Sequence, residues 1–154
     1  MKNAIENLKN ACTEENLWQA IVAFQNFPFY TASGLPFYYS LKTGRNGELT
    51  KELWVNRREN SKSLAWSSVV LAFQHARRTT GEISGPKKLG NIRGISYIYS
   101  IFWKLELIKV PASIAEKMKC WYIFLQDNIL IYRSLRSFGN IIGQSTADFS
   151  ENQS

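Results

Sequence analysis

The side chains of this 154-residue chain whose chemistry is plainest are the lysines and arginines of its middle third. From Lys42 to Arg93 there are eleven basic residues against four glutamates, an excess of seven that equals the net charge of +7 of the whole chain. Clustered ammonium and guanidinium groups attract phosphates and carboxylates and bind them through charge-assisted hydrogen bonds. The charge distribution therefore predicts an acidic partner for this stretch and leaves the flanks to supply the core.

The cations occur in two settings that suit a chain of phosphates. Residues 57–62 form a compact polar group at a predicted strand-to-helix junction, where free N–H groups of a helix start would favour an anion. Simple solvation of these charges is the competing interpretation. Residues 85–93 are expected to form a flexible basic loop bounded by glycines, which could follow a nucleic-acid backbone or an acidic protein groove. The candidate contacts are Arg45, Arg57, Arg58, Lys62, Arg77, Arg78, Lys87, Lys88 and Arg93.

Aromatic residues interleave with these cations, a combination typical of proteins that stack on unpaired bases. Because 14% of the residues are aromatic, most of the rings must belong to the core, and we expect only one or two to be available. Tyr38 and Trp54 are the candidates for stacking.

His75 is the one histidine of the chain. Imidazole groups can act as general acid or base in RNA cleavage without a metal. No second histidine and no acidic cluster accompanies it in the sequence, which favours a structural or surface role. The two cysteines, Cys12 and Cys120, fall short of the roughly four ligands of a structural zinc site. We expect no metal and no cofactor.

The elements that must position these residues are predicted from apolar periodicity and turn signals. Thr13 caps a first helix, an irregular aromatic segment follows it, and Asn46-Gly47 joins two extended runs into a β-hairpin. A helix that opens at Asn60 or Ser61 is expected to be central. The predicted ranges are helix 14–26, strands 37–41 and 49–55, and helices 61–78, 95–108 and 112–119. The fold class is α+β, with three to five helices packed with one β-hairpin.

The length of the chain predicts a small single domain over residues 1–142 and a polar tail over 143–154. Residues 120–132 mix aromatic and β-branched residues, so that either a helix or a strand fits them. The N-terminus is polar, unlike a signal peptide, and no apolar stretch reaches the roughly 20 residues of a membrane span. We therefore expect a cytoplasmic protein with free thiols and no membrane contact.

Several segments carry recognisable motifs: LWQAIVAFQ (17–25), FYTASGLPF (29–37), RRENSKSLAWSS (57–68) and GPKKLG (85–90), followed by YIY (97–99) and Phe102. Over about residues 14–118 the chain resembles a family of small proteins that mobile elements of Gram-positive bacteria encode. Some relatives are anti-CRISPR proteins directed at Cas9. The resemblance implies an inhibitor that acts on this effector or on its guide RNA, and it implies no catalytic residue.

These observations lead to one hypothesis and two alternatives. The hypothesis is a non-catalytic basic module that inhibits Cas9 by engaging its guide RNA or the RNA–protein complex. One alternative is a metal-independent ribonuclease that trims guide RNA with His75 or with a set of tyrosine, arginine and glutamate side chains. The other is a DNA-binding regulator of the mobile element, although the connection 79–91 is much longer than the usual three or four residues of a helix-turn-helix.

Overall fold

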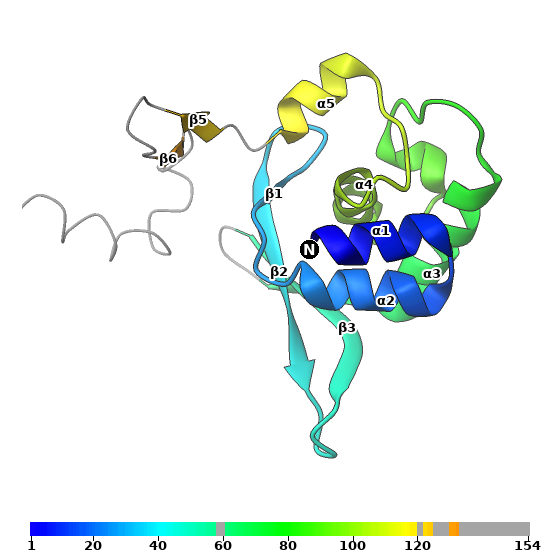
Figure 1. Ribbon diagram of the computed structural model, residues 1–154, viewed down its shortest axis with the longest axis vertical. Coiled ribbons are helices and arrows are strands. Elements are labelled where there is room, and N and C mark those ends of the chain that lie inside the picture. Colours follow the sequence, from blue (N-terminus) through cyan, green and yellow to red (C-terminus); the bar gives the residue numbers. More distant parts are fainter. Residues whose placement is uncertain (58–60, 120–121, 125–129, 133–154) are drawn as a thin grey trace, which may run out of the picture. The chain divides into compact units, whose positions relative to one another are not determined.

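The computed structural model describes residues 1–57, 61–119, 122–124 and 130–132. The chain divides into two compact units, Met1–Lys119 and Cys120–Ser154. Within the described residues, the first unit contains five α-helices, a short 3₁₀-helix and a four-stranded antiparallel sheet (Figure 1). This architecture confirms the predicted α+β class.

The sheet has the strand order β1-β2-β3-β4, with β1 at Phe29–Tyr30, β2 at Pro36–Thr43, β3 at Leu49–Asn56 and β4 at Lys62–Ala65. Strands β2 and β3 form the predicted hairpin, whose turn is closed by the Gly44 amide, which donates to the Glu48 carbonyl at 2.8 Å. Gly47 has a φ of +80°, which explains the strong turn signal of Asn46-Gly47. The tip of the hairpin projects beyond the helices (Figure 1).

The helices lie to one side of this sheet (Figure 1). They are α1 (Lys2–Asn10), α2 (Glu14–Ala23), α3 (Trp66–Arg78), α4 (Ile95–Lys104) and α5 (Ala112–Met118), with the 3₁₀-helix η1 at Pro86–Leu89. Thr13 caps α2 as predicted, because its Oγ1 accepts a hydrogen bond from the amide of Asn16 at 3.2 Å. The sheet is tied to α2 by the Tyr39 hydroxyl, which donates to the Ile21 carbonyl at 2.7 Å.

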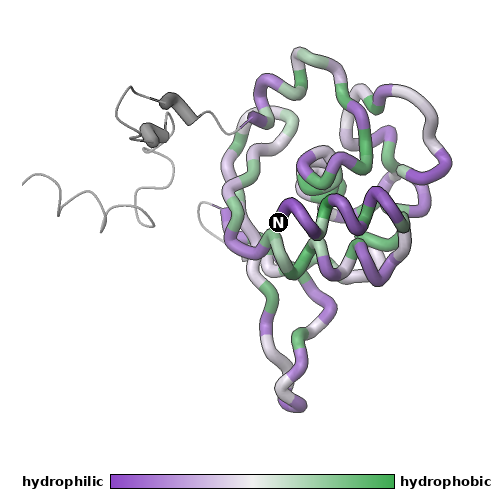
Figure 2. The backbone as a smooth tube through the Cα atoms, viewed as in Figure 1, coloured by the Kyte–Doolittle hydropathy of each residue, from purple (hydrophilic) through white to green (hydrophobic). Residues whose placement is uncertain are grey.

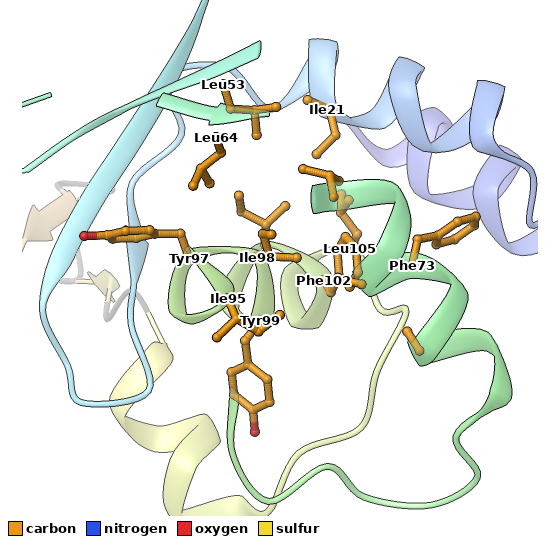
Figure 3. Close-up of a cluster of buried hydrophobic side chains, with 14 of the residues drawn as sticks. Ile21, Leu53, Leu64, Phe73, Ile95, Tyr97, Ile98, Tyr99, Phe102 and Leu105 are labelled. Atoms are coloured by element: carbon orange, nitrogen blue, oxygen red, sulfur yellow. The ribbon is translucent and has the colours of Figure 1, made fainter. Parts of the chain in front are cut away.

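The centre of the unit is α4, whereas the sequence pattern favours α3. Seven of the ten residues of α4 are buried, including Ile98, Tyr99 and Phe102, and side chains from the sheet and from α3 surround them (Figure 3). Helix α3 exposes one face, on which Leu71 is 44% accessible. Figure 2 shows apolar residues along α4 and hydrophilic ones at the tip of the hairpin.

One further prediction about the elements is wrong. The helix expected to open at Asn60 or Ser61 starts only at Trp66, because Lys62–Ala65 pairs with β3 as strand β4. This pairing sets Leu64 opposite Leu53 and buries both, which outweighs the local capping signal of the polar residues before it. In addition, the polar segment 2–10, for which no secondary structure is predicted from the sequence, forms α1, which the Asn16 side chain links to α2 by donating to the Ala11 carbonyl at 2.8 Å.

The second unit resolves the open choice between helix and strand in the part that the structure describes. There β5 (Tyr122–Phe124) pairs antiparallel with β6 (Leu130–Tyr132). The predicted domain end at residue 142 and the predicted tail over 143–154 lie outside the described residues.

Candidate nucleic-acid interface

The fold divides the basic stretch into three separate sets of cations. Arg45 lies at the tip of the β2–β3 hairpin, between Lys42 and Lys51 of its two strands. The connection between β3 and β4 carries Arg57 at one end, and Lys62 begins β4. Since β3 has eight residues and a strand rises about 3.3 Å per residue, roughly 25 Å of strand separates the tip from this connection. The third set lies around the end of α3 and the loop 79–94.

The last set forms what we call the α3–loop surface, defined by Arg77, Arg78, Lys87, Lys88 and Arg93. All five side chains are exposed. Arg77 and Arg78 lie in the last turn of α3, where the helix dipole favours positive charge, and Lys87 and Lys88 lie on η1. Because η1 packs against both α3 and α4, Lys87 and Lys88 lie on an element that contacts α3. Arg93 precedes Gly94, which packs on Leu64 just before the start of α3.

The loop that carries these lysines is anchored to the core, whereas its glycines and lysines predict a flexible loop. Ile83 and Leu89 are buried in the core. The Tyr99 hydroxyl donates a hydrogen bond of 2.5 Å to the Ile83 carbonyl, and the Ile83 amide donates to the Lys109 carbonyl at 2.8 Å. Burial raises the pKa of Tyr99, so that its hydroxyl keeps the proton that this bond needs. The cations of η1 are therefore held in position.

His75 lies at the junction of α3 and this loop, where it is half-buried. Gly90 has a φ of +123°, and a Cβ placed on it would lie 3.0 Å from the His75 Nδ1 atom. This close approach lets the loop pack on the helix. Among the described residues, the His75 side chain has neither a hydrogen-bond partner nor a carboxylate in ion-pair range.

The basic stretch is free of ion pairs in the part of the chain that the structure describes. None of its ten described lysines and arginines has a carboxylate within 4.0 Å. The two ion pairs found there join Lys9 to Glu106 and Lys119 to Glu116, both outside the stretch. The charges of the α3–loop surface are thus not neutralised by neighbouring carboxylates.

The structure changes the interpretation of residues 57–62. Since α3 begins at Trp66, the polar group lies between two strands and has no helix start to add free N–H groups. The predicted anion site at a helix N-terminus is therefore wrong. Arg57 is exposed, whereas Lys62 is half-buried, and Arg58 lies outside the described residues.

The two stacking candidates share the face of the sheet that points away from the helices. Tyr38 and Trp54 are both half-buried and sit on the β2–β3 pair, where Tyr38 opposes Asn56 and Trp54 opposes Ser40. The Lys42 ammonium lies 3.2 Å from the centroid of the Trp54 ring. Lys42 is not among the predicted contacts. It lies where the β2–β3 register shifts, between Leu41 and Thr43, and its contact with the ring places its ammonium on the same face as Trp54.

Sequence reasoning also missed an aromatic cluster that positions the hairpin. The Trp18 and Trp66 rings pack edge to face at 5.0 Å, and the Trp66 indole N–H donates to the Glu14 carboxylate at 2.8 Å. The Lys51 ammonium of β3 lies 5.6 Å from the Trp18 ring and 5.7 Å from the Trp66 ring. Strand β3 is thus joined to α2 and α3 at the base of the projecting hairpin.

Helix α4, the second helix of the helix-turn-helix alternative, does not expose enough of its surface to contact DNA. Helix α4, the candidate for reading a DNA groove, buries seven of its ten residues in the core. A recognition helix must expose the side chains that contact base edges. This geometry does not favour duplex reading by α4.

No three His, Cys, Asp or Glu side chains of the described residues gather in a group that could hold a metal ion. Across the described parts of the chain, every helix is too short or too polar to cross a membrane. Comparison with protein-family models, with curated proteins and with solved structures found no match for this chain.

Proposed function

We propose that the protein is an RNA-binding module that docks on phosphates through the α3–loop surface. The observation that supports the proposal is the gathering of five exposed cations, none with a carboxylate within 4.0 Å among the described residues, on a helix end and an anchored loop. The backbone of the loop is already anchored, so that mainly the side chains lose conformational freedom when they bind. Each phosphate that they neutralise also releases condensed counterions, which favours association.

Two features favour RNA with unpaired regions as the polyanion. The candidate reading helix α4 is buried, so that this helix cannot make sequence-specific contacts in a DNA groove. Aromatic side chains near cations, as at Trp54 and Lys42, suit the splayed bases of single-stranded RNA loops. Together with the family resemblance, this leads us to propose guide RNA, free or bound to Cas9, as the target and inhibition of DNA cleavage as the result.

The direct test is guide-RNA binding at several salt concentrations. Five phosphate contacts to single-stranded RNA predict a slope of log affinity against log salt of about −3.5. The variant Arg78→Glu, Lys87→Glu, Lys88→Glu should bind at least about a hundredfold more weakly and show a shallower slope. Its matched control, Lys2→Glu, Lys104→Glu, Lys117→Glu, changes the net charge equally but away from the surface.

The two variants separate a specific surface from general charge. If the control loses as much affinity as the α3–loop variant, or if the wild-type affinity does not depend on salt, the proposal is wrong. A Cas9 cleavage assay with guide RNA extends the test, because wild type should inhibit and the α3–loop variant should not. The guide RNA recovered from an EDTA-containing reaction should be intact, since the proposed module binds and does not cleave.

A further inference from the structure

The sheet presents a second surface that the phosphate contacts of the α3–loop surface do not use. Alternation along the strands points Phe37, Tyr39 and Val55 into the core. The opposite side is the outer sheet face, which we define by Tyr38, Ser40, Lys42, Trp54, Asn56 and Ser63. Helices α1 to α4 lie on the core side (Figure 1), so that none of these four covers the outer sheet face.

Trp54 is the largest side chain of the outer sheet face and lies in its middle. Its neighbours across the sheet are small, with Ser40 opposite on β2 and Ser63 opposite on β4. Tyr38 is its diagonal neighbour on β2, within reach of an aromatic ring. Across the sheet, the Trp54 indole is therefore flanked by short polar side chains, in contrast to the Trp18 and Trp66 rings, which pack on each other. Along β3, its neighbours on the same face are Glu52 and Asn56.

Two observations indicate that Trp54 lacks its full set of partners. Its indole N–H is buried and donates to no group among the described residues, which is uncommon for a buried polar atom. One face of its ring is occupied by the ammonium of Lys42, a long side chain that can move to another acceptor. A ligand ring can thus take the place of the ammonium over the Trp54 ring, whereas the indole N–H is buried and out of a ligand's reach.

We propose that the outer sheet face binds an unpaired RNA base, which stacks on Trp54 while Lys42 moves to the adjoining phosphate. Stacking of a base on an aromatic ring is generally stronger than a solvent-exposed cation–π contact, so the base can displace the ammonium. The ammonium can exchange the ring for a phosphate, because a phosphate is adjacent to every base. This inference rests on the proposed RNA binding and narrows it to single-stranded RNA, since the faces of paired bases in a duplex are already stacked.

The test compares a 12-nucleotide oligouridylate with an RNA duplex of the same length. Trp54→Ala should weaken binding of the single strand about five- to a hundredfold and leave duplex binding and the salt slope unchanged. Trp54→Phe keeps a ring and should retain most of the affinity. Leu35→Ala, which truncates an exposed apolar side chain outside the outer sheet face, is the control. It should change neither the affinity for the single strand nor the affinity for the duplex.

Fluorescence provides a second readout that needs no folded alanine variant. Oligouridylate should quench tryptophan emission of the wild type more than that of Trp54→Phe, which still contains four tryptophans. Equal quenching of the two proteins, or equal affinity of wild type and Trp54→Ala for the single strand, would overturn the inference. If neither RNA binds even at low salt, the proposed function itself fails; if both bind with a steep slope and Trp54 has no effect, only the stacking inference fails.

Discussion

The α3–loop surface and the outer sheet face come from the same basic stretch of sequence, but they offer different chemistry. The first presents five exposed cations and no exposed aromatic ring among its defining residues. The second presents Trp54 and Tyr38 with a single close cation, Lys42. Cations alone attract any polyanion, whereas aromatic rings distinguish unpaired bases from paired ones. The basic stretch of the sequence thus contributes to two surfaces that would recognise different parts of a nucleotide.

The two surfaces are attached to the core in the same way. Each depends on a buried tyrosine whose hydroxyl donates to a backbone carbonyl: Tyr39 joins the sheet to α2 at Ile21, and Tyr99 joins α4 to the basic loop at Ile83. Gly94 links the regions, because it ends the loop and packs against Leu64 of β4. These contacts allow each region to be perturbed separately or both together.

The largest change in the free energy of unfolding is expected at Gly94, which links the two regions. Gly94 has a φ of +78°, and a Cβ on it would overlap the Cδ2 atom of Leu64. Backbone strain and overpacking together predict that Gly94→Ala lowers the free energy of unfolding by about 2–6 kcal/mol. Gly47→Ala in the hairpin turn has a similar φ of +80° but open space around it, so that it should cost only about 1 kcal/mol. Urea denaturation measures both, and equal losses would contradict the role given to Leu64.

The next largest losses of stability are expected when the two tyrosine hydroxyls are removed, each of which supports one of the two surfaces. Tyr99→Phe removes the donor to the Ile83 carbonyl, and Tyr39→Phe removes the donor to the Ile21 carbonyl. Each leaves a buried acceptor unpaired, which predicts a loss of about 1–3 kcal/mol in the free energy of unfolding. Native-state hydrogen exchange should become faster in the loop 79–94 for Tyr99→Phe and in strands β1 to β3 for Tyr39→Phe. Faster exchange in both regions for both variants would show that the anchors are not independent.

The same tyrosines predict a dependence of stability on alkaline pH. Burial raises the pKa values of Tyr39 and Tyr99 above the usual value of 10.0. The folded state therefore retains protons that the unfolded state releases, so that stability is level below about pH 9 and falls as the pH rises past about 10. Thermal melting between pH 7 and 11 measures this fall, which should be smaller in the Tyr39→Phe, Tyr99→Phe double variant. If stability falls equally in the double variant, ionisable groups other than Tyr39 and Tyr99 cause the fall.

The smallest change in the free energy of unfolding is expected for Lys51, at the base of the hairpin. Lys51→Met removes an ammonium that lies 5.6 Å from the Trp18 ring and 5.7 Å from the Trp66 ring but keeps an apolar side chain. The loss expected from such cation–π contacts is about 0.5–1 kcal/mol. Arg45→Met, at the exposed tip, should leave the free energy of unfolding unchanged. A loss at Arg45 as large as that at Lys51 would argue against the aromatic cluster as the support of the hairpin.

The parts of the fold that could be predicted are those set by neighbours in the sequence. Asn46-Gly47 specifies the hairpin turn, and Thr13 specifies the start of α2, because each acts on backbone groups within a few residues. Helix α1 could not be predicted in this way, since Leu8 is its one fully buried side chain and Asn16 of the next helix supports it. Strand β4 was mistaken for a helix start because its pairing with β3 depends on the burial of Leu64.

The α+β class, the hairpin and the total charge of the basic stretch follow from the sequence alone, since composition and local backbone preferences act without regard to distant residues. Which cations lie near one another depends on tertiary contacts. The packing of Gly90 on His75 brings η1 to the end of α3, whereas the length of β3 separates Arg45 from Arg57. Contacts between residues far apart in the chain form only when burial of the core offsets the entropy lost in closing the loops between them. The balance between these two free energies cannot be inferred from a short stretch of sequence.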